Sequence, residues 1–315
     1  MGKVILQCGG GWPTNIGNAF LDYGVKYLLR EVMPEHSITI CSNAVNWIYS
    51  NYGNKDFFNI ARIAEVDYFV FAGSMLAIQW FKEHSDLFKF LSKTQSKILM
   101  IGVSGETYSE KEIYMIKKYL KKLNVKLFIS RDEECFNHYF HDIEFTYNGI
   151  DSAFFLSDGF KPLAFNTENY NIFCFDSMEE PNIEARGKIL RTHHAPWKVL
   201  SNQLFSKKDI LLFLESIKNS QRNIVRKTDL ISDLPQDYLN LYANCNATYS
   251  DRIHACVAAL TFGKYAQLYN KSSRSHLFDR LELNDIRDEL VKLNSKKLLK
   301  EKENQKDYIK EILTK

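Results

Sequence analysis

The 315-residue chain lacks several features that would place it in common classes of protein. No apolar run approaches the roughly 20 residues of a membrane-spanning helix, and the hydrophobic start Met1–Leu6 is too short for a signal peptide. The six cysteines include no Cys-x-x-Cys pair, which favours buried, reduced thiols. Since 45% hydrophobic and 25% charged residues are ordinary values for a globular protein, we expect a folded, soluble, cytoplasmic chain.

Charge and motif content exclude further classes. A net charge of +3, from 41 basic and 38 acidic residues, is too balanced to imply a nucleic-acid partner. The loop Gly9–Asn18 is glycine-rich but matches neither G-x-G-x-x-G nor the P-loop pattern, so nicotinamide and NTPase functions lose support. His138 and His141 have no carboxylate or third ligand at metal spacing, and we expect no metal site.

The first half of the chain alternates short apolar runs with helical periodicity. This alternation predicts a mostly parallel sheet with helices on both faces. The expected strands are Lys3–Cys8, Ser37–Cys41, Asp67–Ala72, Lys97–Val103 and Lys126–Ile129, and the expected helices are Asn18–Val32, His84–Ser92 and Glu110–Leu123.

A second unit follows the turn-rich stretch Ser157–Pro162. Its expected strands are Asn171–Phe175, Asn223–Arg226, Ala247–Ser250 and Tyr265–Tyr269, and its expected helices are Lys207–Asn219, Leu277–Leu283 and Asn294–Lys315. The fold class predicted is α/β, with two Rossmann-like domains facing across a cleft in a GT-B-like arrangement. We place the domains at residues 1–158 and 159–315, a division that the chain length favours. The last helix could pack back on the first domain.

The end of the chain is rich in lysine. Residues 295–315 contain seven lysines and four acidic residues. A solvated helix face is the favoured reading, and a weak surface for anionic lipid or a lipid-linked substrate is the other.

The most informative segment contains Arg252 and His254, two residues apart where an apolar strand runs out. If the chain is extended up to His254, the side chains of Ser250, Arg252 and His254 leave the same face. The alanine-rich run Ala255–Leu260 predicts a short helix directly afterwards. Strand-to-helix junctions of this kind bind anions in α/β proteins.

A second segment, Asn270-Lys271-Ser272-Ser273-Arg274, follows the next expected strand. Because neighbouring parallel strands end side by side, the two segments would bring Arg, His and Lys together as an anion site. The competing structural interpretation is a histidine capped by Ser250, with Arg252 paired to Asp251.

Two candidate sites come from the first half. Arg131 ends the strand Lys126–Ile129, where it could bind phosphate or carboxylate, or pair with Asp132 or Glu133. The glycine-rich loop would let backbone N–H groups approach an anion or a sugar; its candidate residues are Gly10, Gly11, Asn15, Gly17 and Asn18. In the second half, His193 and His194 are expected in a loop that could touch substrate.

Together these segments resemble the polysaccharide pyruvyl transferase family. The Arg-x-His-Ala run with the later Tyr269-Asn270-Lys271 is the most specific part. The family usually has Asp at the position of Asn18 and a Gly-Gly pair where this chain has Ala72-Gly73. The matching positions are, in the family's order, Asn15-Ile16-Gly17-Asn18, Gly73, Gly102-Val103-Ser104-Gly105, Ser130-Arg131-Asp132, Asp151, Arg252-Ile253-His254-Ala255 and Tyr269-Asn270-Lys271.

The resemblance implies an enzyme that moves the enolpyruvyl group of phosphoenolpyruvate onto two hydroxyls of a sugar, giving a pyruvate ketal in cell-surface polysaccharide biosynthesis. Arg252, Lys271 and Arg131 would hold the donor's phosphate and carboxylate, and His254 would protonate its methylene carbon. No metal or organic cofactor is required. Further substrate-binding candidates are Ser272, Asn270, Gly73, Ser74 and Ser104.

The acceptor implied is a nucleotide- or lipid-linked sugar on the side of the first domain, at the inner face of the membrane if lipid-linked. The base that takes the hydroxyl proton is not identified; His84, Asp151 and a group near Asn18 are candidates. Two other functions stay open. One is a GT-B glycosyltransferase that holds a nucleotide-sugar diphosphate, and the other is a catalytically silent glycan-binding relative, consistent with Asn18.

Overall fold

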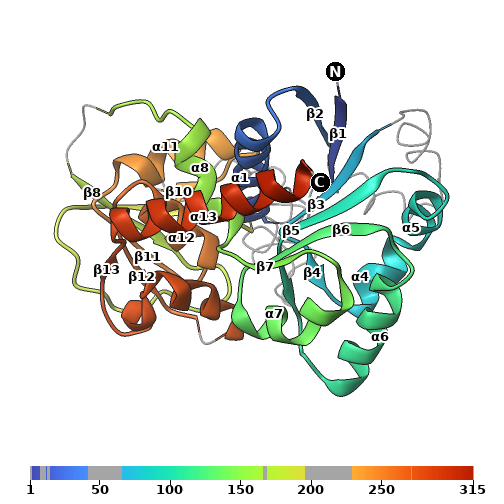
Figure 1. Cartoon of the computed structure of the whole chain (residues 1–315). Helices are drawn as coiled ribbons and strands as arrows, with labels where there is room; N and C mark the ends of the chain where they lie inside the picture. Colours follow the sequence, from blue (N-terminus) through green and yellow to red (C-terminus); the bar gives the residue numbers. More distant parts are fainter. Residues whose placement is uncertain are drawn as a thin grey trace, which may run out of the picture.

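Two sheets, built from the two halves of the chain, form the framework of the protein (Figure 1). The computed structural model describes residues 2–7, 12, 15–41, 66–165, 169–195, 229–270 and 272–314. Both sheets are parallel except at one edge strand of the second. The predicted α/β class with two facing Rossmann-like units is therefore confirmed.

In the first sheet the strand order is β2-β1-β3-β5-β6-β7, and β4 pairs with the end of β5. Its strands are β1 (Gly2–Gln7), β2 (His36–Cys41), β3 (Tyr68–Ala72), β4 (Met75–Leu76), β5 (Lys97–Gly105), β6 (Val125–Ser130) and β7 (Thr146–Asn148). The helices of this half are α1 (Gly17–Val32), α4 (Ile78–Glu83), α5 (Ser85–Leu91), α6 (Glu110–Leu120) and α7 (Glu133–Tyr139).

The strands of this sheet are apolar along their length because both faces of the sheet are covered. Along β5, Ile98 and Met100 belong to one hydrophobic cluster. Leu99 and Ile101 belong to a second cluster on the opposite face. Alternate side chains of one strand thus enter two separate cores.

In the second sheet the order is β10-β9-β8-β11-β12-β13, with β13 antiparallel to β12. Its strands are β8 (Tyr170–Cys174), β9 (Lys188–Thr192), β10 (Asp229–Leu230), β11 (Ala247–Ser250), β12 (Tyr265–Leu268) and β13 (Val291–Lys292). Its helices are α11 (Pro235–Asn244), α12 (Ile253–Thr261), the 3₁₀ helices η3 (Ser273–Leu281) and η4 (Asn284–Arg287), and α13 (Ser295–Leu313).

Most predicted elements within the described ranges agree with the structure to within a few residues. The helix expected at Leu277–Leu283 is a 3₁₀ helix that begins earlier, at Ser273. The predictions Lys207–Asn219 and Asn223–Arg226 lie outside the described residues. The sequence analysis did not predict β9 or α11.

The two halves are joined by one continuous hydrophobic cluster around α1, which includes Phe20 and Leu28 from the first half and Ile172 and Val257 from the second. Helix α1 contacts the 3₁₀ helix η2 (Ser152–Phe155), α8 (Leu156–Gly159) and α12. Close packing of α1 against η2 requires a glycine, because a Cβ on Gly24 would overlap the carbonyl oxygen of Ser152.

Helix α13 runs from the second half across to the first (Figure 1). Lys302 Nζ lies 2.6 Å from Asp158, and Lys306 Nζ lies 2.6 Å from Glu31 on α1. Gln305 Oε1 accepts the backbone N–H of Ile150 at 2.9 Å. The division at residue 158 stays a prediction, but α13 makes contacts on both sides of it.

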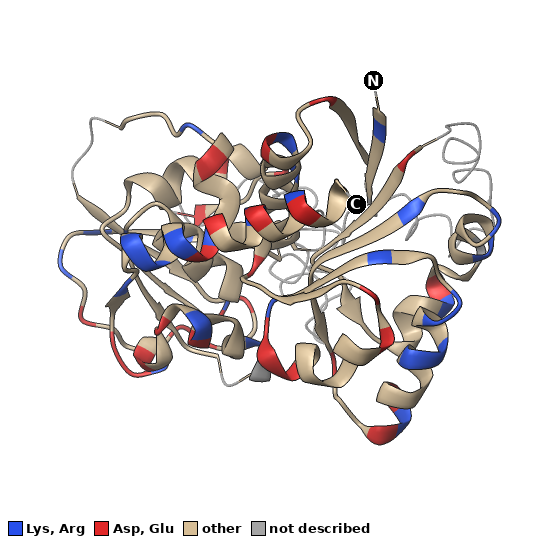
Figure 2. Cartoon of the chain, viewed as in Figure 1, with Lys and Arg blue, Asp and Glu red and all other residues tan. Residues whose placement is uncertain are grey.

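Some lysines of the segment 295–315 are not solvated but bonded to the rest of the protein. Basic and acidic residues both lie along α13 (Figure 2), and Lys302 and Lys306 are engaged in ion pairs with the rest of the protein. Within the described ranges, no helix combines the length and the apolar character needed to cross a bilayer.

The Gly24 contact leads to a prediction on stability. Glycine-to-alanine changes inside helices normally stabilise by up to about 1 kcal/mol. We expect Gly24→Ala instead to destabilise by about 1–3 kcal/mol, because α1 must move away from Ser152. Urea unfolding measures the change, with Arg30→Ala on the exposed side of α1 as control; a more stable Gly24→Ala variant would contradict the packing.

Candidate active site

The carboxyl ends of strands from both sheets open onto one cleft of about 350 Å³. This is the position where open α/β sheets bind ligands. The first half contributes Asn15, Asn18, Leu21, Gly73, Met75 and Arg131; the second half contributes His194, Asp251, Arg252, Ile253, His254, Asn270, Ser272, Arg274 and Leu277.

Nine of the residues singled out as candidates from the sequence line this cleft: Asn15, Asn18, Gly73, Arg131, His194, Arg252, His254, Asn270 and Ser272. Gly17 lies directly behind it, where a Cβ would be 3.0 Å from His194 Nδ1 and 3.1 Å from His254 Cβ. Ser74 and Ser104 are buried and do not line it. Gly10, Gly11 and Lys271 lie outside the described residues.

The Arg-x-His pair lies at a strand-to-helix junction, as expected, but its backbone differs from the prediction. Strand β11 ends at Ser250, Arg252 caps α12, and His254 is already helical. The single extended face through Ser250, Arg252 and His254 was therefore wrong. Ser250 Oγ instead accepts the backbone N–H of Arg252 at 2.7 Å and donates to the Cys174 carbonyl at 2.8 Å.

The two candidate segments of the second half do lie side by side, because β11 and β12 are parallel neighbours. Asn270 links them: its Nδ2 donates to the carbonyl of Asp251 at 2.9 Å, and its Oδ1 accepts the N–H of Ser272 at 2.7 Å. Ser272 then caps η3 through the N–H of Arg274. Asn270 and Ser272 thus shape the loop as well as line the cleft.

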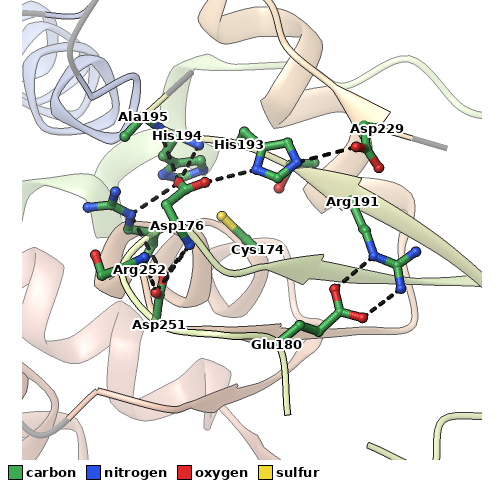
Figure 3. Close-up of polar contacts among 12 residues, drawn as sticks. Cys174, Asp176, Glu180, Arg191, His193, His194, Ala195, Asp229, Asp251 and Arg252 are labelled. Carbon is green, nitrogen blue, oxygen red and sulfur yellow. Dashed lines mark hydrogen bonds and ion pairs between the residues drawn. The ribbon is translucent and has the colours of Figure 1, made fainter. Parts of the chain in front are cut away.

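A buried carboxylate, Asp176, fixes the direction of Arg252 (Figure 3). Asp176 Oδ2 accepts Arg252 Nε at 3.2 Å and the backbone N–H groups of His194 and Ala195 at 2.9 and 3.1 Å. Its Oδ1 lies 2.9 Å from His193 Nδ1. Burial alone would raise the pKa of Asp176, but the hydrogen bond from His193 and the charge of Arg252 outweigh burial and lower it.

Asp251, the partner expected for Arg252, mainly accepts hydrogen bonds from the backbone. Its carboxylate accepts the backbone N–H groups of Asp176, Ser177 and Met178, and its distance to Arg252 Nε is 3.8 Å. The guanidinium of Arg252 keeps its Nη2 buried and without a hydrogen-bond partner among the described residues. One edge of this cation is therefore available to a ligand.

A second buried carboxylate, Asp151, joins the two halves. Its Oδ2 lies 3.3 Å from Arg131 Nη1 and 3.6 Å from His254 Nε2, and its Oδ1 accepts the N–H of Ala153. Burial would raise the pKa of Asp151, but His254 and Arg131 together lower it. Arg131 is thus paired with Asp151, not with Asp132 or Glu133; Asp132 caps α7 instead.

The sequence reasoning included Arg274 in the second segment but gave it no role at the site. This arginine follows Ser272 by two residues, and it lines the cleft. Burial and the positive charge of Arg131 lower the pKa of Arg274. Its place in the loop after β12, three residues from Lys271, was the available signal.

Of the three residues considered for the base, Asp151 is at the site and is paired with cations. His84 lies in the aromatic cluster of the first half, with its Nδ1 2.9 Å from the carbonyl of Trp80. Asn18 lines the cleft. Throughout the described part of the chain, no group of three or more His, Cys, Asp or Glu side chains could hold a metal ion.

Buried polar atoms without partners gather at this cleft. Within the described ranges, Arg252 Nη2, His254 Nε2 and His194 Nδ1 make no hydrogen bond. Such atoms are rare in folded proteins because an unpaired buried polar group is costly. The three at the cleft are available to a polar ligand.

A wider cavity of about 760 Å³ lies between α7 and η3 and shares Arg131 with the cleft. Its lining combines amide and imidazole groups with carboxylates and includes Asn137, His138, Asn148, Asp132, Glu133, Glu134 and Asp279. Arg131 is therefore in contact with two adjoining spaces.

Two facing Rossmann-like units with a cleft at their strand ends define a GT-B-like α/β protein. Similar solved structures include a Listeria monocytogenes protein named for the UDP-N-acetylglucosamine 2-epimerases, with 10% identity and a TM-score of 0.50 over 99% of this chain and 90% of that chain. Another is an uncharacterized Klebsiella pneumoniae protein, with 15% identity and a TM-score of 0.49 over 91% and 90% of the two chains. At these identities the likeness concerns the fold alone.

The sequence profile of the polysaccharide pyruvyl transferases matches residues 15–266. The chain belongs to this family, as its motifs indicated. A search of curated proteins found no match.

The ion pairs of the site lead to a prediction on acid stability. Because the pKa of Asp176 is lowered in the folded protein, its ionised form stabilises the fold above the unfolded pKa near 4, and this contribution is lost as the pH falls below that value. We expect Asp176→Asn to have a lower free energy of unfolding than the parent at pH 7, and this free energy to fall less than that of the parent on acidification. Unfolding curves at several pH values test this, with exposed Asp285→Asn as control; identical pH slopes for Asp176→Asn and the parent would contradict it.

Proposed function

We propose that the protein transfers the enolpyruvyl group of phosphoenolpyruvate onto two hydroxyls of a sugar, forming a pyruvate ketal in cell-surface polysaccharide biosynthesis. The observation that carries this proposal is the set of cations around one small cleft. Arg131, Arg252 and Arg274 line it from both halves. Phosphoenolpyruvate carries a phosphate beside a carboxylate, and guanidinium groups bind both in bidentate geometry.

The carboxylates around the cleft already have partners within the protein. Asp251 accepts backbone N–H groups, Asp176 accepts backbone N–H groups as well as Arg252 and His193, and Asp151 is shared by Arg131 and His254. We assign Arg252 to the donor's negative groups, with Arg131 and Arg274 beside it. Lys271 keeps its proposed role on the donor, and the donor side is the second domain.

The chemistry requires an acid near the donor's methylene carbon. Protonation of that carbon makes C2 electrophilic, and a sugar hydroxyl then attacks C2. His254 is assigned this role, because its side chain lines the cleft and its Nε2 lies 3.6 Å from Asp151, which holds the ring beside the donor. Asn15, Gly17, Asn18, Gly73 and the loop glycines Gly10 and Gly11 would form the wall facing the donor.

The acceptor has room in the wider cavity between α7 and η3. We propose that a nucleotide- or lipid-linked sugar enters there, since the cavity adjoins the donor cleft at Arg131 and offers amide groups that suit sugar hydroxyls. The reaction would take place in the cytoplasm, at the inner face of the membrane if the acceptor is lipid-linked.

Pyruvyl transfer is tested by incubating the protein with phosphoenolpyruvate and a panel of methyl hexosides and UDP-linked sugars. We expect phosphate release and a gain of roughly 70 Da on one sugar, the mass of the ketal unit. Stabilisation by UDP sugars, with no binding of phosphoenolpyruvate, would instead support a glycosyltransferase.

Two variants separate donor binding from proton transfer. We expect Arg252→Ala to weaken phosphoenolpyruvate binding by about 10–100-fold, the range for a lost charge-assisted hydrogen bond. We expect His254→Ala to lower kcat by about 100-fold or more with a smaller effect on binding. Calorimetry and phosphate release measure the two effects, with exposed His141→Ala as control. A folded His254→Ala variant with undiminished phosphate release would rule out the acid role.

A further inference from the structure

We propose that His194 is the general base that accepts the proton of the attacking sugar hydroxyl. This assignment rests on the proposed transfer reaction and adds the group that the sequence left unidentified. Three features of His194 support it: the fixed position of the ring, the ring nitrogen that has no partner, and surroundings unlike those of His254.

The backbone of His194 is fixed by both halves of the protein. Its N–H donates to Asp176 Oδ2 at 2.9 Å, and its carbonyl accepts the N–H of Ile16, just before α1, at 2.8 Å. The fully buried ring packs edge-on against Phe20 and Tyr242, with centroids 5.4 and 5.7 Å away. The imidazole therefore has one defined position at the wall of the cleft.

The two ring nitrogens have different surroundings. Nε2 lies 2.7 Å from the hydroxyl of Tyr242, and that hydroxyl lies 2.9 Å from Thr192 Oγ1. A chain in which Nε2–H donates to Tyr242 and Tyr242 donates to Thr192 leaves the lone pair on Nδ1. This tautomer is the one a base requires.

Nδ1 lies beside Gly17, at the point where two residues that line the cleft, Asn15 and His254, converge. It has no hydrogen-bond partner among the residues that the structure describes. A Cβ on Gly17 would lie 3.0 Å from Nδ1, 3.1 Å from Asn15 Oδ1 and 3.1 Å from His254 Cβ. Any larger residue at position 17 would therefore crowd both histidines and Asn15.

The surroundings of the two histidines differ. Burial lowers the pKa of His194 to about 3, with Arg252 adding to the effect and Asp176 opposing it, so the free imidazole is neutral. The Nε2 of His254 instead lies 3.6 Å from the Asp151 carboxylate. A neutral imidazole with an open nitrogen suits the role of base, and the imidazole beside a carboxylate keeps the acid role assigned above. A bound phosphate near Arg252 would offset the positive charge that His194 acquires.

The protons balance over the full reaction. His254 gives a proton to the methylene carbon while the first hydroxyl loses its proton to His194 Nδ1 and its oxygen bonds to C2. The C2–O bond to phosphate then breaks, and the second hydroxyl adds to C2 and releases its own proton. One of the two hydroxyl protons replaces the proton that His254 gave to the new methyl group, and the other leaves on the phosphate.

The decisive variant is His194→Gln, which keeps a polar side chain but cannot accept a proton. We expect kcat for phosphate release to fall by about 100-fold or more, while the Kd for phosphoenolpyruvate changes by less than about twofold. His84→Gln is the matched control, because His84 is also a buried histidine but lies away from the cleft. Its kcat should stay at the parent value.

Tyr242→Phe gives a second route if His194→Gln does not fold. It removes the partner that holds Nε2–H, so kcat should fall by about tenfold at unchanged phosphoenolpyruvate Kd. An unchanged kcat in folded His194→Gln, or a parallel loss of donor binding and kcat in either variant, would overturn the base role alone. A parent protein that neither binds phosphoenolpyruvate nor releases phosphate would overturn the proposed function, and the base role with it.

Discussion

The carboxylate of Asp176 holds together the ends of three strands of the second sheet. It follows β8, bonds to the backbone and a side chain just after β9, and receives Arg252 just after β11. A buried carboxylate is stable only when hydrogen bonds and cations surround it. The direction of Arg252 and the position of His194 both depend on this one group, and so does the shape of the cleft.

Asp151 has the matching role across the cleft. It follows β7, caps η2, and lies within ion-pair distance of Arg131 from the first half and His254 from the second. This carboxylate is the group that Arg131 and His254 share. Helix α13, bonded to Ile150 and Asp158, supports the same segment from behind. The relative placement of the halves and the electrostatics of the site are thus coupled.

The arginines of the cleft match the negative charge of the proposed donor. The acids near the site are bonded to backbone N–H groups or shared between cations, whereas Arg252 keeps a buried nitrogen without a partner among the described residues. Family membership, the cations and the paired histidines all favour a small dianionic or trianionic donor. The acceptor is less constrained, because cavity walls formed by loops and helix ends vary freely on this fold.

The sequence by itself determined the strand-and-helix alternation, the strand-end position of Arg131 and the junction that bears Arg252 and His254. These follow from local periodicity and from the rule that parallel strands end at one edge. Tertiary structure decided which carboxylate each cation meets: Asp151 lies 20 residues after Arg131, and Asp176 lies 76 residues before Arg252. It also brought His194 against Gly17 and made it neutral through burial. Pairing and burial are properties of residues distant in sequence, so no local pattern could predict them.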